Sequence, residues 1–379
     1  MLYEGCCVGR DTSKGGDWEM RRLFICNTHS QLINALHMTL SIFKDEECDV
    51  LITDQSNGLE GVYERLRNRE NHVFDHIYFI QTKRMCSPQD VKAFLHSLVK
   101  TVFINKEFDV LDLKYDEVIY YNYDFALLSI FDKAKQKNPD VKFSRFEEGV
   151  LSYTHEFTYS KLKLIKVCRK LIFKKNIKED GQTFYCYFPE LYTGKRKTIK
   201  IPLINDDIEV LKSILFDCYS FNDEKVVDNY KFIFFTSIYD FEGGDPIGEY
   251  QTVERIADIV GKNNILIKKH PRDPRDVYEK NGFTVEQKSS IPWEIMQFKF
   301  DLSKIVMLSV NSGAILSSSM LFDNKSEAYF TFGMCDLRGN ELARESIRNI
   351  QQLLESPIFK KNFPNIQALS DLNQLEKYE

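Results

Sequence analysis

The chain has 379 residues, more than one hydrophobic core usually serves, so we expect two domains of ordinary size. Hydrophobic residues make up 43% of the chain and the formal net charge is −5, which fits a globular protein and gives no reason to expect a nucleic-acid partner. Nine cysteines without a CxxC pair argue against a disulfide framework and a zinc site. Residues 1–25 lack the apolar core of a signal peptide, and no apolar run is long enough to span a bilayer, so we expect a cytoplasmic protein.

The N-terminal part of the chain alternates between strand-like and helix-like segments. Residues 1–19 are aperiodic and rich in turn formers, and we expect them to be a disordered extension. Because helices between apolar strands imply a parallel sheet, residues 20–156 are predicted to form a Rossmann-like domain. Its predicted strands are 22–28, 48–54, 76–81 and 116–124, and its predicted helices are 30–43, 61–70 and 88–101.

A second series of the same kind fills the C-terminal part. Residues 196–379 are therefore predicted to form another Rossmann-like domain, and the fold class is α/β with two such domains facing a central cleft. The predicted strands are 231–237, 264–270, 283–287, 305–310 and 328–333, with a helix at 249–260.

The predicted domains are joined by a basic amphipathic segment over residues 157–195. Residues 160–178 contain eight Lys or Arg interleaved with apolar residues. This pattern is typical of a helix that contacts an anionic membrane surface, and equally of a solvated helix that covers a domain junction.

Polar residues follow the predicted strands of the first domain, where a parallel sheet binds its ligands. Thr28 suits a helix cap as well as a ligand contact, whereas Gln31 in the first helical turn has no structural need to be polar. Glu147 and Glu148 precede Gly149, which lets the backbone turn away. The pair could take a proton from a substrate hydroxyl or form an ordinary charged turn.

The acidic, glycine-rich loop at residues 236–250 follows a strand of the second domain. Asp245 precedes a proline and could cap the next helix. Asp240, Glu242 and Asp245 could each instead present a carboxylate to the cleft, and the sequence does not choose among them.

His270 and Pro271 end the next predicted strand. A histidine titrates near neutral pH and can donate a proton to a departing phosphate, and the proline fixes the backbone beside it. An isolated pair of this kind is also a common way to end a strand.

Three more candidates begin predicted helices in the second domain. Glu294 lies in the first helical turn after a proline and could accept hydrogen bonds from ribose hydroxyls. Asn311 and Ser312 precede Gly313 at a strand-to-helix junction, where small polar residues and free amides can hold a phosphate. The spacing matches neither a Walker loop nor GxGxxG, so an NTPase or an NAD enzyme is not indicated.

The order of these pieces resembles the bacterial sialyltransferases of the glycosyltransferase-B fold, which share a (D/E)(D/E)G motif, an HP motif and a serine motif. Glu294 follows His270 by 24 residues, and Ser312 follows it by 42. Within this group the chain is most similar to glycosyltransferase family 52, the lipooligosaccharide and capsule sialyltransferases, over residues 20 to 335. The motifs that carry this similarity are NTHSQLINA, FEEGVLSY, YFPELY and KKHPRD.

The resemblance implies that sialic acid moves from CMP-sialic acid to a galactose-terminated glycan, with inversion and without a metal ion or another cofactor. It assigns His270 to the leaving phosphate, Glu294 to the ribose, and Asn311 with Ser312 to the phosphate. Donors of this kind would stabilise the charge that develops on the departing nucleotide. A homodimer is also implied.

The general base is left open by the resemblance. In some related families the (D/E)(D/E)G carboxylate takes the acceptor proton, which corresponds to Glu148. In family 52 the base lies in the loop before the HP strand, where Asp245 is the preferred match.

Two alternatives to this interpretation are a relative that uses another sugar nucleotide and a non-catalytic glycan-binding protein of the same fold. The expected partners are CMP-sialic acid, the glycan acceptor and an anionic membrane. We expect the protein on the inner face of the cell membrane.

Overall fold

The computed structural model describes residues 20–82, 111, 114–121, 125–149, 151–154, 181–204, 208–221, 230–288 and 290–378. By its internal contacts the chain divides into two compact units. The first consists of Met1–Glu148, His155–Pro202 and Asp206–Phe221, and the second of Gly149–Thr154, Leu203–Asn205 and Asn222–Glu379.

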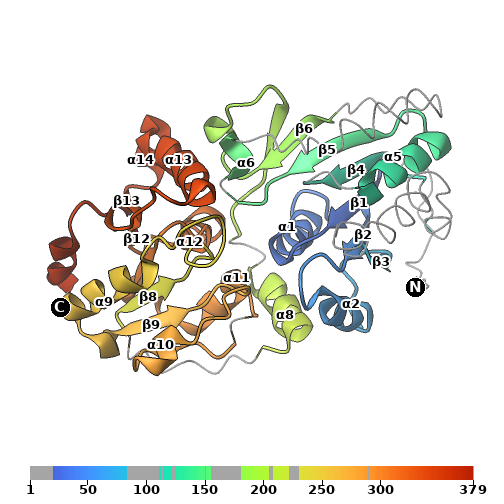
Figure 1. Cartoon of the computed structure of the whole chain (residues 1–379). Coiled ribbons are helices and arrows are strands. Elements are labelled where there is room, and N and C mark those ends of the chain that lie inside the picture. The colour runs from blue at the N-terminus through green and yellow to red at the C-terminus, as the bar shows by residue number, and fades with distance from the viewer. Residues whose placement is uncertain are drawn as a thin grey trace, which may run out of the picture. The chain divides into compact units, whose positions relative to one another are not determined.

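The first unit is built on a seven-stranded parallel sheet with the order β3-β2-β1-β4-β5-β6-β7 (Figure 1). Its strands are β1 Arg21–Cys26, β2 Glu47–Thr53, β3 Ile77–Ile80, β4 Glu117–Tyr120, β5 Lys142–Phe146, β6 Gly181–Cys186 and β7 Lys197–Lys200. Its helices are α1 His29–Leu40, α2 Leu59–Arg67, α5 Phe125–Lys137, α8 Ile208–Tyr219 and the short 3-10 turn η3 Pro189–Leu191.

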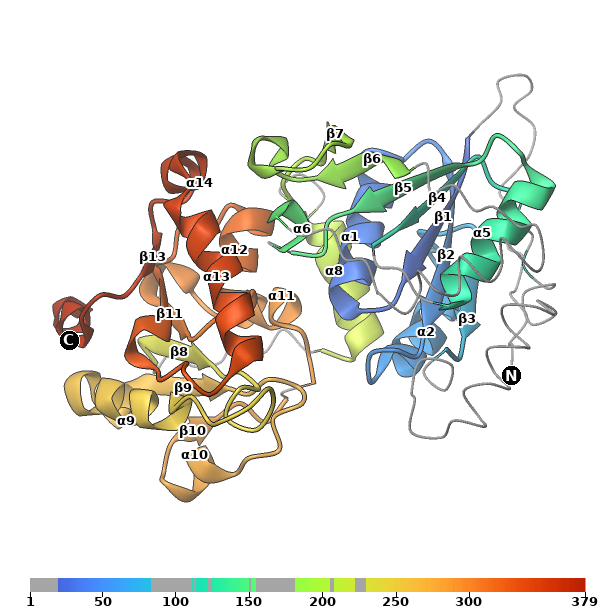
Figure 2. The ribbon, with the colours of Figure 1, turned by 45° about the horizontal axis from the view of Figure 1, so that its top comes forward.

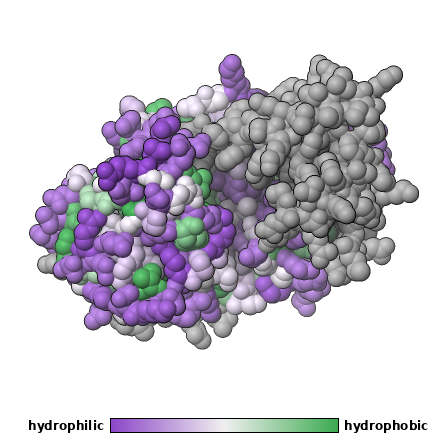
Figure 3. All heavy atoms as spheres, viewed as in Figure 1, coloured by the Kyte–Doolittle hydropathy of each residue, from purple (hydrophilic) through white to green (hydrophobic). Residues whose placement is uncertain are grey.

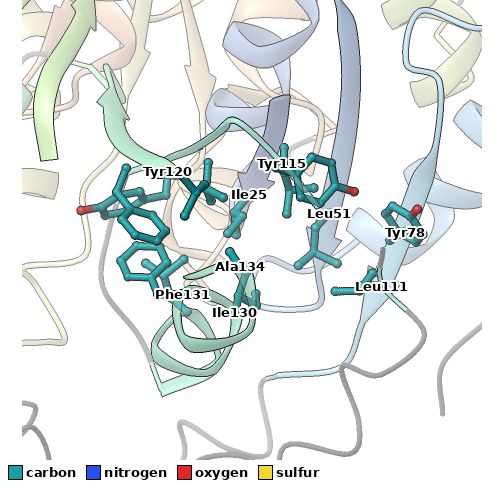
Figure 4. Packing of buried hydrophobic residues seen from close by; sticks show 14 of the residues in the cluster. Ile25, Leu51, Tyr78, Leu111, Tyr115, Tyr120, Ile130, Phe131 and Ala134 are labelled. Carbon is teal, nitrogen blue, oxygen red and sulfur yellow. The ribbon is translucent and has the colours of Figure 1, made fainter. Parts of the chain in front are cut away.

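Helix α5 packs its apolar side against the first sheet, where its residues join those of the strands in one core (Figure 4). The rings of Phe131 on α5 and Phe143 on β5 lie 4.0 Å apart between centroids. Strands β3 and β4 are buried along their whole length, which explains the apolar sequence of β3 and of β4 after Glu117. The paired charges of Arg22 and Glu117, 3.0 Å apart, satisfy each other inside this sheet.

The second unit contains a six-stranded parallel sheet with the order β10-β9-β8-β11-β12-β13 (Figure 2). Its strands are β8 Phe232–Phe235, β9 Ile265–Lys268, β10 Thr284–Val285, β11 Val306–Ser309, β12 Ala328–Phe330 and β13 Ile366–Ala368. Its helices are α6 Leu151–Thr154, α9 Glu249–Val260, α10 Val277–Lys280, α11 Trp293–Met296, α12 Ala314–Phe322, α13 Glu341–Glu355 and α14 Pro357–Asn362. Short 3-10 turns are η4 Lys262–Asn264, η5 Gln297–Lys299, η6 Leu302–Lys304, η7 Phe332–Met334 and η8 Leu372–Tyr378.

The outer surface of the second unit is mostly hydrophilic, with apolar residues scattered singly on the face that Figure 3 shows. Leu342 and Ile358 are large apolar side chains exposed in this unit. Among the helices of the described ranges, none combines the length and the apolar character that crossing a bilayer requires.

The predicted α/β class with two Rossmann-like units is confirmed, as both sheets are parallel and their strands alternate with helices along the chain. The first unit extends past residue 156, where the first domain was predicted to end, because β6 lies in the predicted linker and β7 and α8 lie in the predicted second domain. β7 pairs with β6, and α8 packs on α1 and α2. Sequence alone could not show this, because β7 is short and strongly charged. The extension at residues 1–19, the predicted helix at 88–101 and the basic residues 160–178 lie outside the described residues.

Candidate functional site

The two acidic residues after β5 have different surroundings. Glu147 is buried: its carboxylate accepts the Tyr187 N–H at 3.0 Å, and its carbonyl accepts the side-chain amide of Asn34 at 2.7 Å. Glu147 therefore ties the end of β5 to β6 and α1. Glu148 remains partly exposed at the carboxyl edge of the first sheet, where a ligand can reach it.

The start of α1 surrounds Glu148 with hydrogen-bond donors. Thr28 caps the helix by accepting the Gln31 N–H at 3.3 Å, and its hydroxyl donates to the Glu148 carboxylate. The side-chain oxygen of Gln31 accepts the Asn27 N–H at 2.7 Å, so its amide hydrogens are the ones directed to Glu148. The predicted residues Thr28, Gln31 and Glu148 thus lie together.

Burial raises the pKa of Glu148 to about 7. The hydrogen bonds from Thr28 and Gln31 and the positive charge of Arg145 lower this pKa but do not outweigh the loss of hydration. A carboxylate with a pKa near the working pH has the properties of a general base or acid.

A buried chain of polar side chains, not predicted from the sequence, supports this corner. Tyr187 donates to Asn34 Oδ1 at 3.1 Å, and His37 Nδ1 lies 3.0 Å from the Tyr187 oxygen. Since the Tyr187 hydrogen is used by Asn34, His37 donates to Tyr187. Burial lowers the pKa of His37 to about 4. The signal that could have revealed it is the Asn34 and His37 pair, three residues apart within the mostly apolar stretch of residues 32–38.

In the second unit, β9 leads directly to His270. The His270 N–H donates to Thr236 Oγ1 at 2.9 Å, and the Thr236 hydroxyl donates to Asp273 at 2.8 Å. The Asp273 N–H closes the turn on the His270 carbonyl at 2.8 Å, with Pro271 inside it. The turn is therefore anchored to the end of the neighbouring strand β8.

The ring of His270 has one defined tautomer. The Arg272 main-chain N–H donates to Nδ1 at 3.0 Å, so a neutral ring carries its hydrogen on Nε2. Burial, and then the positive charges of Arg272 and Lys268, lower the pKa of His270 to about 4. His270 is therefore a neutral Nε2–H donor at pH 7.

Glu294 lies in the single turn of α11, near Ser317 on α12, whose hydroxyl donates to the Ala314 carbonyl at 2.9 Å. Burial raises its pKa, while Ser317 and the nearby charge of Lys268 oppose this rise. Lys268 is buried at the end of β9, and the loss of hydration lowers its pKa to about 8. Lys268 was not among the predicted site residues.

Ser312 and Asn311 follow β11, but their side chains differ in availability. Asn311 donates its two amide hydrogens to Tyr239 at 2.8 Å and to Ser346 at 3.0 Å, so this side chain organises the loop. The predicted phosphate contact of Asn311 would need its main chain instead. Ser312 Oγ accepts the Ala314 N–H at 3.3 Å, which leaves its hydroxyl hydrogen to donate at the start of α12.

The three candidate carboxylates of the 236–250 loop, Asp240, Glu242 and Asp245, have different surroundings. Asp240 accepts the N–H groups of residues 247 to 249 at 3.0 to 3.2 Å and so caps α9. Glu242 pairs at 3.2 Å with Arg272 at the surface. Asp245 is exposed, and its main chain is fixed by the Gly339 carbonyl at 2.9 Å and by the Asn340 side chain at 3.1 Å.

Arg275, which was not predicted, contacts three buried or nearly buried carboxylates. It forms ion pairs with Asp240 at 2.8 Å, Glu249 at 2.8 Å and Asp273 at 2.7 Å. Its position five residues after His270, in a segment with alternating charges, is the only signal that the sequence offers. In the part of the chain that the structure describes, no three His, Cys, Asp or Glu side chains gather as a metal site.

Comparison with known proteins gives one family match. A family model described as alpha-2,8-polysialyltransferase (POLYST) matches residues 22–329. No curated protein sequence matches the chain significantly.

Solved structures with a similar arrangement are distant. An alpha/beta-galactoside alpha-2,3-sialyltransferase from Photobacterium phosphoreum has a TM-score of 0.46 at 13% identity, over 94% of this chain and 100% of that one. MurG from Acinetobacter baumannii has a TM-score of 0.44 at 10% identity, over 94% of this chain and 89% of that one. The family match is the finding that bears on identity.

Proposed function

Because the chain belongs to the alpha-2,8-polysialyltransferase family, and is thus a glycosyltransferase that moves sialic acid, we propose that its donor is CMP-sialic acid. We propose a terminal galactose of a bacterial surface glycan, in a capsule or lipooligosaccharide, as the acceptor. The narrower assignment to glycosyltransferase family 52 is part of this proposal. The observation that carries it is the defined Nε2–H of His270 at the carboxyl edge of the second sheet.

His270 has the properties that departure of CMP requires. In the proposed reaction the acceptor oxygen bonds to the anomeric carbon of sialic acid, and the bond from that carbon to the phosphate oxygen breaks. The electron pair leaves with CMP, where Nε2–H of His270 stabilises the new charge. A bound phosphate favours the imidazolium and raises the low pKa of His270, so the residue can become protonated as the donor binds.

Three further side chains of the second unit suit the nucleotide. Glu294 offers carboxylate oxygens to the ribose hydroxyls, and Ser312 offers its hydroxyl to the phosphate at the start of a nine-residue helix. Pro271 restricts the backbone on which His270 is held. The Ser312 hydroxyl and Nε2–H of His270 supply the charge stabilisation that a metal-independent reaction needs, and full activity in EDTA is the corresponding test.

The acceptor hydroxyl must lose a proton, and Glu148 and Asp245 are the proposed alternatives. The raised pKa of Glu148, about 7, suits proton uptake near neutral pH. Asp245 lies in the loop next to the His270 turn and is exposed to solvent. Attack from the face opposite CMP would invert the anomeric centre with either base.

The family description itself favours a second acceptor. An alpha-2,8 linkage joins one sialic acid to another, so a sialylated glycan is the alternative to a terminal galactose. Incubation with CMP-sialic acid and a panel of plain and sialylated galactosides, with the product linkage read by NMR, separates the two. Transfer to neither would reject the proposed reaction.

The choice of donor is tested separately. Binding of CMP and UDP, measured by calorimetry, distinguishes CMP-sialic acid from a different sugar nucleotide, because a UDP-sugar enzyme binds UDP in preference. A protein that binds the glycan but shows no turnover with any donor would instead be a non-catalytic member of the fold.

The basic segment is proposed to place the enzyme at the inner face of the cell membrane. Eight Lys or Arg in residues 160–178 predict binding to anionic vesicles that weakens as salt rises. Equal binding to neutral vesicles would reject this role. The proposed homodimer is checked by light scattering of the same preparation.

A further inference from the structure

Arg275 lies at the centre of a buried charge cluster in the second unit, behind the turn that carries His270. Its guanidinium holds Asp273 with two nitrogens, Nε at 2.8 Å and an Nη at 2.7 Å. The other contacts reach Asp240 and Glu249, both at 2.8 Å. A planar group with donors in fixed directions can make this set of bonds, whereas a lysine ammonium cannot.

The three carboxylates belong to two different segments. Asp273 is part of the His270 turn, which it supports by accepting from Thr236. Asp240 and Glu249 belong to the loop that follows β8 and the start of α9. Glu249 also accepts the Ser237 N–H at 2.7 Å, so it fixes the beginning of that loop.

The charges explain why Arg275 is needed in this cluster. Three carboxylates repel one another, and the side chains of Glu249 and Asp273 are 0% exposed. Without a cation between them the two segments would separate, or one carboxylate would take up a proton. The rings of Phe241 and Tyr278 pack against the guanidinium, with their centroids 5.3 and 5.6 Å from Cζ of Arg275. This packing limits the movement of the guanidinium.

We propose that Arg275 is a positioning residue that holds the His270 turn and the loop of residues 237–249 in one arrangement, and so fixes the direction of the Nε2 hydrogen of His270. This proposal rests on the proposed function of His270. The loop also carries Asp245, so Arg275 sets the position of this carboxylate relative to the histidine as well.

Substitution of Arg275 by lysine tests geometry apart from charge. Arg275→Lys keeps the positive charge but loses the two-pronged contact with Asp273, so we expect a kcat at least about tenfold lower, with the KM for the donor changed less than about threefold. Arg344→Lys, at an exposed pair with Glu341 3.0 Å apart, is the matched control and leaves kcat unchanged.

The deciding measurement is the NMR titration of the His270 ring, which needs no turnover. The groups that set its pKa are Lys268, Arg272 and Asp273. A lysine at position 275 cannot make both contacts with Asp273, so it neutralises this carboxylate less completely, the carboxylate acts more strongly on the ring, and water enters the turn. Both effects raise the pKa, so we expect His270 to titrate at higher pH in Arg275→Lys than in the wild type.

Thr236→Val provides a second variant if Arg275→Lys does not fold. It removes only the hydroxyl that joins His270 to Asp273 and should shift the titration in the same direction. An unchanged His270 titration in a folded Arg275→Lys protein, or in Thr236→Val if the first does not fold, overturns the proposal. A wild type that transfers no sialic acid would reject the proposed function, while the titration would still decide the role of Arg275.

Discussion

The main-chain N–H of Arg272 donates to Nδ1 of His270 over 3.0 Å, which places the hydrogen of the neutral ring on Nε2. Burial of the ring, and then the positive charges of Arg272 and Lys268, lower the pKa of His270 to about 4, so the ring is uncharged at neutral pH. The turn therefore sets the direction of the ring hydrogen, and burial sets the charge state of the histidine. Protonation then becomes coupled to the arrival of an anionic ligand.

Binding of CMP should raise the pKa of His270. NMR titration of the ring without nucleotide should show the neutral form down to about pH 5, and saturating CMP should move the titration upward. His270→Ala should lower kcat by about 10² to 10⁴. An identical titration with and without CMP would contradict the assignment of His270 to the phosphate.

The environment of Glu148 predicts a pH profile. If Glu148 is the base, kcat/KM falls as the pH drops below its pKa of about 7, because the protonated carboxyl cannot accept a proton. Thr28→Val removes a hydrogen bond that lowers this pKa, so the acidic limb should move to higher pH. Glu148→Gln should abolish the limb together with most of the activity.

Asp245→Asn is the matched experiment on the other candidate base. If Asp245→Asn loses activity while Glu148→Gln stays nearly active, the general base is Asp245 in the loop of the second unit and not Glu148. A profile whose acidic limb does not respond to Thr28→Val would also argue against Glu148.

Much of the fold was predictable because it depends on local sequence patterns. The central strands β1, β2, β8 and β11 are buried on both faces, so their apolar runs identify them. β7 could not be identified in this way, because it is a four-residue strand with lysine at both ends. Its place in the first sheet comes from pairing with β6, which is a tertiary contact.

Residues of the candidate site could be predicted from the sequence where they directly follow a strand. His270 and Glu148 were named from their positions after strands, and both lie at the carboxyl edge of a sheet. Arg275 and His37 were missed because their significance depends on partners far away in the sequence. Asp240 is 35 residues from Arg275, and Tyr187 is 150 residues from His37.

Burial of His37 should make the protein less stable in mild acid. The unfolded chain binds a proton at this residue near pH 6.5, but the folded protein does so only near pH 4. Stability therefore falls as the pH drops through this window, by up to about 1.4 kcal/mol per pH unit. Between pH 7 and pH 5 the loss attributable to His37 should be about 2 kcal/mol.

Urea unfolding at pH 7 and pH 5 measures this loss. His37→Gln can still donate to Tyr187 but does not titrate, so its free energy of unfolding should decline less between the two pH values than that of the wild type. His72→Gln, at a partly exposed histidine, serves as the control and should decline like the wild type. Equal declines in all three proteins would exclude His37 as the cause.

The loop that carries Asp245 should be sensitive to a single methyl group. Gly244 has φ +141° and forms an isolated β-bridge with Asn340. A Cβ at Gly244 would lie only 2.1 Å from the carbonyl oxygen of Gly339. Gly282 has φ +77° and nothing within 4 Å of such a Cβ. Gly282→Ala should cost about 1 to 2 kcal/mol from strain alone, and Gly244→Ala should cost more. Only Gly244→Ala should lower kcat. The check is to measure kcat and thermal unfolding in both variants.

Lys268 should make nucleotide binding depend on pH. Because its pKa is about 8, the ammonium loses its proton as the pH rises above this value, and its attraction to an anionic nucleotide and to Glu294 disappears. Calorimetric titration with CMP should therefore show weaker binding at pH 9 than at pH 7. In Lys268→Met the affinity should be low and nearly constant over this range.

The control for Lys268 is Lys304→Met, which removes an exposed lysine paired with Asp301 at 2.8 Å in the same unit. It should retain the wild-type pH dependence, since a solvated charge contributes little at a distance.

Lys268→Met also removes a charge that lowers the pKa of Glu294, so this carboxyl should stay protonated to higher pH and accept ribose hydroxyls less well. Comparing CMP with 2′,3′-dideoxy-CMP separates the two effects, because only the ribose contribution is lost with the dideoxy ligand. A variant that binds CMP as the wild type does at both pH values would exclude Lys268 from the donor site.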